Sequence, residues 1–153
     1  MRSSNIVAVV AAMAGRDFAT WLDSSTMTRI STSKLHGVGV MAIKRIEAGV
    51  DPFPGIKKRR PLVPMTIDEV MKLEPEVQRM VVDFCLPDVN GTYWVYRDGF
   101  TSMDLSFYVN HSQDPNLETV QVPGSTLCGF RTLRPIEVGE ELTFCYGVNV
   151  EFN

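Results

Sequence analysis

Turn-forming residues recur so closely along this sequence that they leave room mostly for short extended segments. Asn90-Gly91 is a strong hairpin signal, Asp98-Gly99 marks a second turn, and Gly139 comes just before the last extended run. A further break is expected at Gly37-Val38-Gly39. The segments between these turns are rich in β-forming residues, and they lie at 28–32, 40–46, 92–96, 120–122, 126–131 and 141–145. The pattern therefore predicts a mainly β fold.

The middle of the chain instead carries helix signals. Thr66, with Glu69 three residues later, forms a capping box at the start of a helix. Pro75 requires a break or a new start, because proline is tolerated only in the first turn of a helix. We therefore expect two short helices, at about 67–73 and 75–84.

These signals divide the chain into a leader at 1–26, one domain at 27–148 with a helical insert at about 56–100, and a short tail at 149–153. The leader is expected to be helical, because its apolar residues recur at helical spacing; they are Ile6, Val9, Val10, Met13, Phe18, Trp21 and Leu22. The apolar run before Gly15 also resembles a weak signal peptide, although it is too short to span a membrane. The periodicity favours the ordinary helix, and the targeting peptide stays the alternative.

The charge balance bears on the kind of partner. The chain has 153 residues and a net charge of −3, which argues against a dedicated nucleic-acid binder, since such domains usually carry a basic face. A mildly acidic surface suits a basic peptide. The basic run Lys57-Lys58-Arg59-Arg60 fits a nuclear-import or phosphate-contacting patch, but a solvated loop is the favoured interpretation.

Cysteine usage indicates the compartment. The three cysteines, Cys85, Cys128 and Cys145, are odd in number, and no two have C-x-x-C spacing. A disulfide framework and a structural zinc site are therefore both disfavoured, and we predict no metal site. The simplest location is a reducing one, inside the cell in the nucleus or the cytoplasm.

Three stretches carry more information than composition does. They are Leu35-His36-Gly37-Val38-Gly39-Val40-Met41-Ala42, Tyr108-Val109-Asn110-His111-Ser112-Gln113-Asp114-Pro115-Asn116, and the run from Arg134 to Gly147 that contains Gly139-Glu140-Glu141-Leu142-Thr143-Phe144-Cys145-Tyr146. Each has an ordinary explanation when taken alone: a glycine turn, a loop of turn-forming residues, and a turn followed by a strand.

Together and in this order, the three stretches resemble the SET-domain family, over roughly residues 27–148. The likeness is greatest to short SET proteins that have little beyond the catalytic core. The resemblance implies small β-sheets around a C-terminal pseudoknot. It also implies methyl transfer from S-adenosylmethionine to lysine in a protein substrate, such as a basic peptide or a histone tail.

The resemblance assigns the cofactor contacts to two of the stretches. Gly37, Val38 and Gly39 would border the methionine end of the cofactor, where glycines let the backbone approach a ligand closely. Asn110 and His111 would hold the cofactor, Asn110 through a side-chain amide with both donor and acceptor atoms and His111 partly through backbone groups near the adenine.

The third stretch supplies the expected chemistry. Tyr146 matches the family's catalytic tyrosine, whose hydroxyl would orient the methyl-sulfonium and the incoming amine. A phenol with a pKa of about 10 is protonated at neutral pH, so a role as a full general base is not assigned. Phe144 matches the position that helps to set how many methyl groups fit, and Tyr108 is assigned with it to the lysine channel.

The sequence departs from the family pattern at three points. Gln113 stands where many members have cysteine, and Cys145 stands where many have aspartate. The sequence ends at Asn153 without the cysteine-rich zinc segment that follows many SET domains. We expect either a short tail or a second subunit of a homodimer to close the channel. Phe152 is a candidate to stack on the adenine, with an aromatic that packs onto the core as the alternative.

Two other functions compete with this one. The first is a SET fold that has lost catalysis and acts as a binding module, which the intact Asn110, His111 and Tyr146 disfavour. The second is a cysteine hydrolase built on Cys145 and His111 with Asp114 or Asn110, which needs a polarised thiol beside its base and lacks the local signatures of such enzymes.

Overall fold

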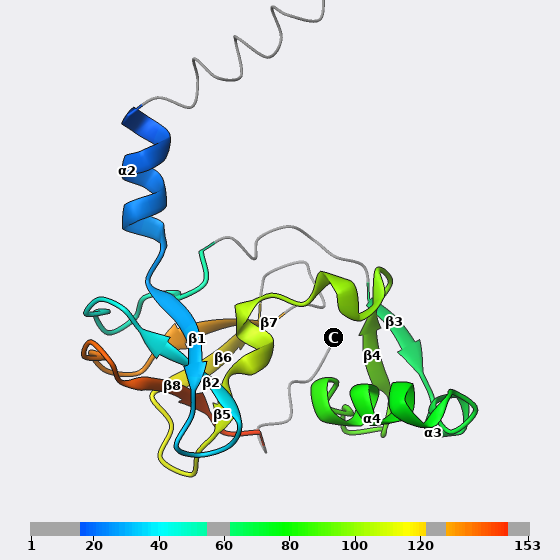
Figure 1. Ribbon diagram of the computed structural model, residues 1–153. Coiled ribbons are helices and arrows are strands. Elements are labelled where there is room, and N and C mark those ends of the chain that lie inside the picture. Colours follow the sequence, from blue (N-terminus) through cyan, green and yellow to red (C-terminus); the bar gives the residue numbers. More distant parts are fainter. Residues whose placement is uncertain (1–15, 55–61, 122–127, 147–153) are drawn as a thin grey trace, which may run out of the picture.

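The computed structural model describes residues 16–54, 62–121 and 128–146 (Figure 1). Most of the elements are short strands, with helices and 3-10 turns before the first strand and in the middle of the chain. In order the elements are α2 (Arg16–Ser25), β1 (Thr28–Thr32), β2 (Val38–Ala42), β3 (Leu62–Met65), α3 (Ile67–Val70), α4 (Pro75–Phe84), β4 (Tyr93–Tyr96), η1 (Gly99–Ser102), η2 (Leu105–Tyr108), β5 (Asn110–His111), β6 (Leu117–Gln121), β7 (Cys128–Thr132) and β8 (Glu141–Phe144).

The main sheet brings the two ends of the domain together. Its strand order is β1-β2-β8-β5, so the last strand of the domain lies inside the sheet rather than at its edge. β8 pairs antiparallel with β2 and parallel with β5, where Asn110 lies opposite Thr143 and His111 lies opposite Phe144. Two further sheets have two strands each, β3 with β4 and β6 with β7. The expected mainly β fold of small sheets is confirmed.

A contiguous apolar core lies between the main sheet and the β6–β7 hairpin. Its buried side chains are Val40, Ala42, Ile46, Phe53, Val109, Leu117, Ile136 and Leu142. Ile46 and Ile136 exchange backbone hydrogen bonds of 3.0 and 2.8 Å and join the segment after β2 to the segment before β8. Full burial of one such side chain stabilises a fold by about 1.5–3 kcal/mol. This core therefore holds the elements that carry the three sequence stretches in fixed relative positions.

The insert between β3 and β4 has a smaller core of its own. Val70, Val81 and Cys85 are buried there, and partly buried neighbours surround them. Two ring pairs connect the insert to the segment before β5: Phe84 with Tyr108, at a centroid distance of 6.1 Å, and Tyr96 with Phe107, at 5.4 Å. The insert lies beside the main sheet in Figure 1.

Local signals in the insert were read correctly except at one helix end. The capping box is present, because Glu69 N donates to Thr66 Oγ1 and Thr66 N donates to Glu69 Oε2. α4 begins with Pro75 in its first turn, as predicted. The first helix ends at Val70 rather than 73. Glu74, which precedes the proline, has a ψ of 144°, outside the helical region, so the chain must leave the helix before this residue.

Several strand boundaries differ from the prediction. The break expected at Gly37-Val38-Gly39 lies earlier, because Ser33 Oγ accepts hydrogen bonds from two backbone amides of a turn that ends at Gly37, whose φ is +50°. Val38 and Gly39 belong to β2, which ends at Ala42 rather than 46. The sequence prediction missed β3 and β5 and started β6 at Val120 rather than Leu117.

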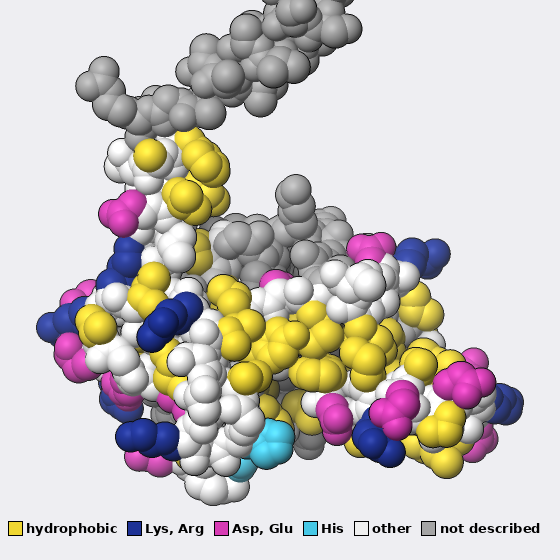
Figure 2. Space-filling model, viewed as in Figure 1, with side chains coloured by type: hydrophobic (Ala, Val, Ile, Leu, Met, Phe, Trp, Pro, Cys, Tyr) yellow, Lys and Arg dark blue, Asp and Glu magenta, His cyan; other side chains and the backbone are white. Residues whose placement is uncertain are grey.

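The described part of the leader is helical, as α2, and residues 1–15 lie outside the described residues. One side of α2 is apolar in Figure 2, and about half of the surface of Phe18, Trp21 and Leu22 is exposed. Within the described ranges, no helix combines the length and the apolar character needed to cross a membrane.

Candidate active site

Three segments that are far apart in the sequence meet around β8. The turn before β2 carries Gly37, β5 consists of Asn110 and His111, and the chain leaving β8 carries Tyr146. The parallel pairing of β5 with β8 sets His111 opposite Phe144, two residues before the tyrosine. The sheet therefore assembles nearly all of the residues that the sequence singled out.

Tyr146 is anchored at both ends. Its backbone N–H donates to Nδ1 of His111 at 3.0 Å, and its hydroxyl donates to the carbonyl oxygen of Val109 at 2.8 Å. The side chain is partly exposed, and burial of the remainder raises the pKa of the phenol above its ordinary value of 10.0. The hydroxyl is therefore neutral at physiological pH. Because its proton is committed to Val109, its lone pairs remain to accept a hydrogen bond.

The hydrogen bonds of His111 identify its tautomer. Nδ1 accepts from the Tyr146 amide, so the ring proton of the neutral imidazole lies on Nε2. Nε2 is 3.0 Å from the side-chain amide of Gln113. The Gln113 atom at this distance is the amide nitrogen Nε2, so two donors would meet, and the pair forms a hydrogen bond only when the amide is rotated to present its oxygen. In that orientation Gln113 supports the imidazole ring of His111, and the ring in turn accepts from the backbone amide of Tyr146.

The side chain of Asn110 has a defined orientation. Its Nδ2 lies 2.9 Å from the carbonyl oxygen of Val38, 3.3 Å from that of His36 and 2.8 Å from Oε1 of Glu141. All three neighbours are acceptors, so the amide nitrogen must face them. Among the described residues, the amide oxygen has no hydrogen-bond donor and remains an open acceptor.

The two glycines of the first stretch have different reasons to be glycine. Gly37 adopts a positive φ of +50°, and a Cβ there would meet nothing within 4 Å, so the backbone borders open space. A Cβ on Gly39 would lie 2.2 Å from Oε1 of Glu141 and 3.0 Å from Nδ2 of Asn110. Glycine at 39 therefore makes room for the contact between Asn110 and Glu141.

A row of aromatic rings leads from the core to Tyr146. Successive ring centroids lie 5.8 Å apart for Phe53 and Phe130, 5.1 Å for Phe130 and Phe144, and 4.7 Å for Phe144 and Tyr146. Phe144 is thus next to the tyrosine, as a channel residue would need to be. Tyr108, assigned to the same channel, makes its ring contact with Phe84 of the insert.

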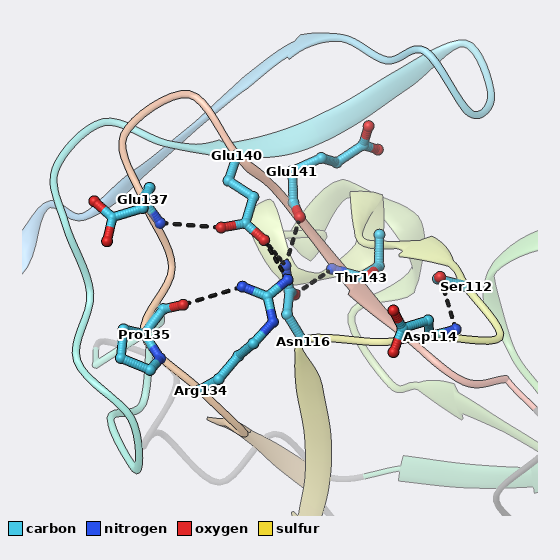
Figure 3. Close-up of polar contacts among 9 residues, drawn as sticks. All are labelled: Ser112, Asp114, Asn116, Arg134, Pro135, Glu137, Glu140, Glu141 and Thr143. Atoms are coloured by element: carbon cyan, nitrogen blue, oxygen red, sulfur yellow. Dashed lines mark hydrogen bonds and ion pairs between the residues drawn. The ribbon is translucent and has the colours of Figure 1, made fainter.

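A buried polar network fastens β8 in place (Figure 3). Asn116 is 3% exposed; its Nδ2 donates to the Glu141 carbonyl at 2.8 Å, and its Oδ1 accepts from Thr143 N at 2.9 Å. Nδ2 also lies 3.2 Å from Glu140, whose carboxylate pairs with Arg134. The hydrogen bond from Arg134 is the main cause that lowers the pKa of Glu140. Asn116 is therefore hydrogen-bonded to the backbone of β8, the strand that leads to Tyr146.

Four residues have roles in the structure that the motifs alone did not predict. They are the side chains of Glu141, Asn116 and Gln113 and the backbone carbonyl of Val109. Leu142 and Thr143 are consecutive and both buried, so β8 has no alternation of buried and exposed positions that could have marked the side of the sheet on which Glu141 lies. No local signal could have supplied its partners, since Ser33 is 108 positions away in the sequence.

Among the described residues, Cys145 and His111 make no hydrogen bond of the kind that a nucleophilic thiol and its base need. Both nitrogens of the histidine ring have other partners, Tyr146 N and the Gln113 amide. Burial raises the pKa of the Cys85 thiol to about 11, so that thiol is unreactive at neutral pH. Within the described ranges, no group of three His, Cys, Asp or Glu side chains is placed to hold a metal ion.

Comparison with known proteins identifies relatives of this arrangement. A family model described as the SET domain matches residues 37–147. Over 51 residues the chain is 45% identical to the histone-lysine N-methyltransferase Set2 of Drosophila melanogaster. That segment makes up 32% of this chain and only 2% of the relative.

Two solved structures share this fold. A Plasmodium falciparum protein, solved as a candidate histone methyltransferase, matches 80% of this chain and 95% of its own length, with a TM-score of 0.51 and 17% identity. A humanized mutant of the Chaetomium thermophilum Polycomb Repressive Complex 2 matches 80% of this chain and 15% of its own, with a TM-score of 0.54 and 26% identity. The first likeness is one of fold alone.

Proposed function

The chain belongs to the SET-domain family, and on that premise we propose that it transfers a methyl group from S-adenosylmethionine to the side-chain amine of lysine in a protein substrate. The observation that supports this most is the arrangement around Tyr146. Its hydroxyl is held by the carbonyl of Val109, directly beside Asn110 and His111. Two of the relatives, the Drosophila and the Plasmodium proteins, are histone methyltransferases by name, so a histone tail is the first substrate to test.

The residues fit the cofactor. S-adenosylmethionine carries a primary ammonium and a carboxylate at one end, and when bound it supplies an electrophilic methyl group on a sulfonium. Asn110 offers an open acceptor oxygen toward an ammonium, and Gly37 leaves its backbone accessible beside it. The carboxylate of Glu141 adds negative charge next to Asn110, which suits a ligand with two cationic groups.

The chain's own contribution is mostly positioning. Methyl transfer needs the amine, the methyl group and the sulfur in line, and fixing such a geometry can contribute roughly 7–11 kcal/mol to lowering a barrier. Tyr146 accepts at its oxygen because it donates to Val109, so it can orient an amine N–H or a polarised methyl C–H. Its raised pKa argues against a phenolate base, and we propose that the substrate ammonium loses its proton to solvent before transfer.

An apolar part of the surface suits a lysine side chain. Figure 2 shows hydrophobic side chains gathered in a band across the face between the main sheet and the insert, with histidine atoms (cyan) at its lower edge. The aliphatic part of a lysine can pack on such a band. The net charge of −3 fits a basic peptide better than a nucleic acid. That the protein forms a homodimer and that it lies inside the cell both stay predictions.

The alternative is a SET fold that binds a partner without catalysis. Its discriminating feature is the hydroxyl of Tyr146, which a pure binding module does not need. The occupied hydrogen bond to Val109 and the open oxygen of Asn110 favour the enzyme.

The decisive experiment supplies labelled S-adenosylmethionine with a panel of histones and whole lysate. The wild type is expected to label a protein substrate, and the cofactor should raise the melting temperature, because ligand binding to the native state stabilises it. Tyr146→Phe should keep cofactor binding but lose about two orders of magnitude in methyl transfer. An unchanged melting curve at saturating cofactor would contradict the proposal, and cofactor binding without any transfer would favour the binding module.

A further inference from the structure

Glu141 lies at the meeting point of three segments of the site. Its carboxylate oxygens accept from the hydroxyl of Ser33 at 2.8 and 2.9 Å, and Oε1 also accepts from Nδ2 of Asn110 at 2.8 Å. The strand register places Glu141 opposite Met41 on β2, and its side chain crosses the space that a Cβ of Gly39 would fill. One partly buried carboxylate thus contacts the turn before β2, β2 itself and β5.

The contact with Ser33 organises the turn that carries Gly37. The same serine oxygen accepts from the backbone amides of Leu35 at 2.8 Å and His36 at 3.1 Å. With both amides donating to it, the hydroxyl must direct its own proton elsewhere, and Glu141 is the acceptor. Losing the carboxylate would leave that proton without its charged partner and loosen the turn.

The contact with Asn110 sets which end of the amide faces outward. The carbonyls of His36 and Val38 also lie near Nδ2, but a hydrogen bond to an ionised acceptor is roughly twice as strong as a neutral one. If the Asn110 amide were rotated by 180°, its oxygen would face the negatively charged carboxylate of Glu141. Of the three acceptors around Nδ2, Glu141 therefore disfavours the rotated orientation most strongly. The outward atom is then the oxygen, which accepts but cannot donate.

Resting on the proposed function, we infer that Glu141 is a positioning residue for the amino-acid end of the cofactor. It holds the Asn110 oxygen toward the ligand's ammonium and fixes the turn that ends at Gly37. Gly39 contributes to the same arrangement, because any side chain at position 39 would displace the carboxylate of Glu141. The contribution is specific to the ammonium-bearing end and should not extend to the adenosine.

Two ligands separate this role from general structural support. S-adenosylhomocysteine has both the amino-acid end and the adenosine, whereas 5′-methylthioadenosine lacks the amino-acid end. Calorimetric titration of Glu141→Ala should show S-adenosylhomocysteine binding weakened by about 10-fold or more, the loss typical of a charge-assisted contact. Methylthioadenosine should change by less than about threefold, which corresponds to well under one such contact.

Matched variants test the orientation step. Glu141→Gln keeps an acceptor oxygen for Ser33 and Asn110. It should recover much of the wild-type preference for S-adenosylhomocysteine over methylthioadenosine. Gly39→Ala should reproduce the loss, and combining it with Glu141→Ala should add little, because both act on one contact. Glu137→Ala is the control, since its exposed carboxylate lies 3.6 Å from Arg45 and belongs to a neighbouring turn.

The outcomes distinguish the inference from the function on which it rests. If Glu141→Ala weakens both ligands by the same factor, or neither, the positioning role is wrong while the proposed cofactor stands. If the wild type binds neither ligand, the proposed function fails and takes the inference with it. Because each variant is judged by the ratio of two affinities, a modest loss of stability does not imitate the expected result.

Discussion

Phe144 is the residue at which a single oxygen atom should change the product. Its ring lies between those of Phe130 and Tyr146, at centroid distances of 5.1 and 4.7 Å. Each further methylation needs space for the methyl groups already on the amine. A hydroxyl at position 144 would anchor a water in that space, and displacing an ordered water without replacing its hydrogen bonds is unfavourable.

We therefore expect the wild type to form di- or trimethyl-lysine and Phe144→Tyr to accumulate monomethyl-lysine with a similar first-step rate. Mass spectrometry of a peptide substrate over time measures both. Phe130→Tyr is the matched control, because it adds the same hydroxyl one ring further from Tyr146. A wild type that stops at monomethyl-lysine would show that other residues set the multiplicity.

Residue identities were predictable at the site, but their contacts were not. The types and order of Asn110, His111 and Tyr146 were enough to suggest the family and the chemistry. The roles of Glu141 and Gln113 depend on distances through space to Ser33 and to the histidine ring. Such distances follow from strand register, which residue types alone do not encode.

At the scale of elements, Asn116 should be the most sensitive position near β8. Asn116→Ala would leave the Glu141 carbonyl and the Thr143 amide without partners in a buried setting, at a cost of about 2–4 kcal/mol in unfolding free energy. Asn116→Asp keeps the acceptor for Thr143 but sets a carboxylate against the Glu141 carbonyl and near Glu140. Its destabilisation should shrink in acid, where the new carboxyl is protonated.

Denaturant unfolding at two pH values measures both variants. Asn90→Ala, at an exposed position, is the control and should change the unfolding free energy much less. Equal stability of Asn116→Ala and the wild type would mean that β8 is held by its strand pairings alone.

The elements that were predicted correctly are those with local causes. The capping box at Thr66 and the start of α4 at Pro75 depend on residues within one helical turn. β5 was missed because a two-residue strand has no periodicity to detect, and its parallel pairing with β8 joins segments more than 30 positions apart in the sequence. The site is built on that pairing, so its geometry could not be derived from local patterns.

For the molecule as a whole, we expect the stability of the folded state to fall when the pH is lowered. The pKa values of Glu140, Asp88 and Glu69 are all lowered in the folded state, the first by Arg134, the second mainly by the indole N–H of Trp94 and the third mainly by the Thr66 amide. A lowered folded pKa means that the ionised form favours the native state. The stabilisation is complete above the unfolded pKa of about 4 and is lost as pH falls through the folded pKa.

The three carboxylates lie in different parts of the fold, Glu140 beside the main sheet and the other two in the insert, so acid should weaken both cores together. We expect the melting temperature to be nearly constant from about pH 7 to pH 5 and to fall below about pH 4. Asp88→Asn should melt lower than the wild type at neutral pH, because Asp88 accepts from Trp94 Nε1 and from the amides of Asn90 and Thr92. The difference should narrow in acid, where the wild-type carboxyl is itself neutral, and a difference that stays constant across this range would show that the carboxylate's charge contributes nothing.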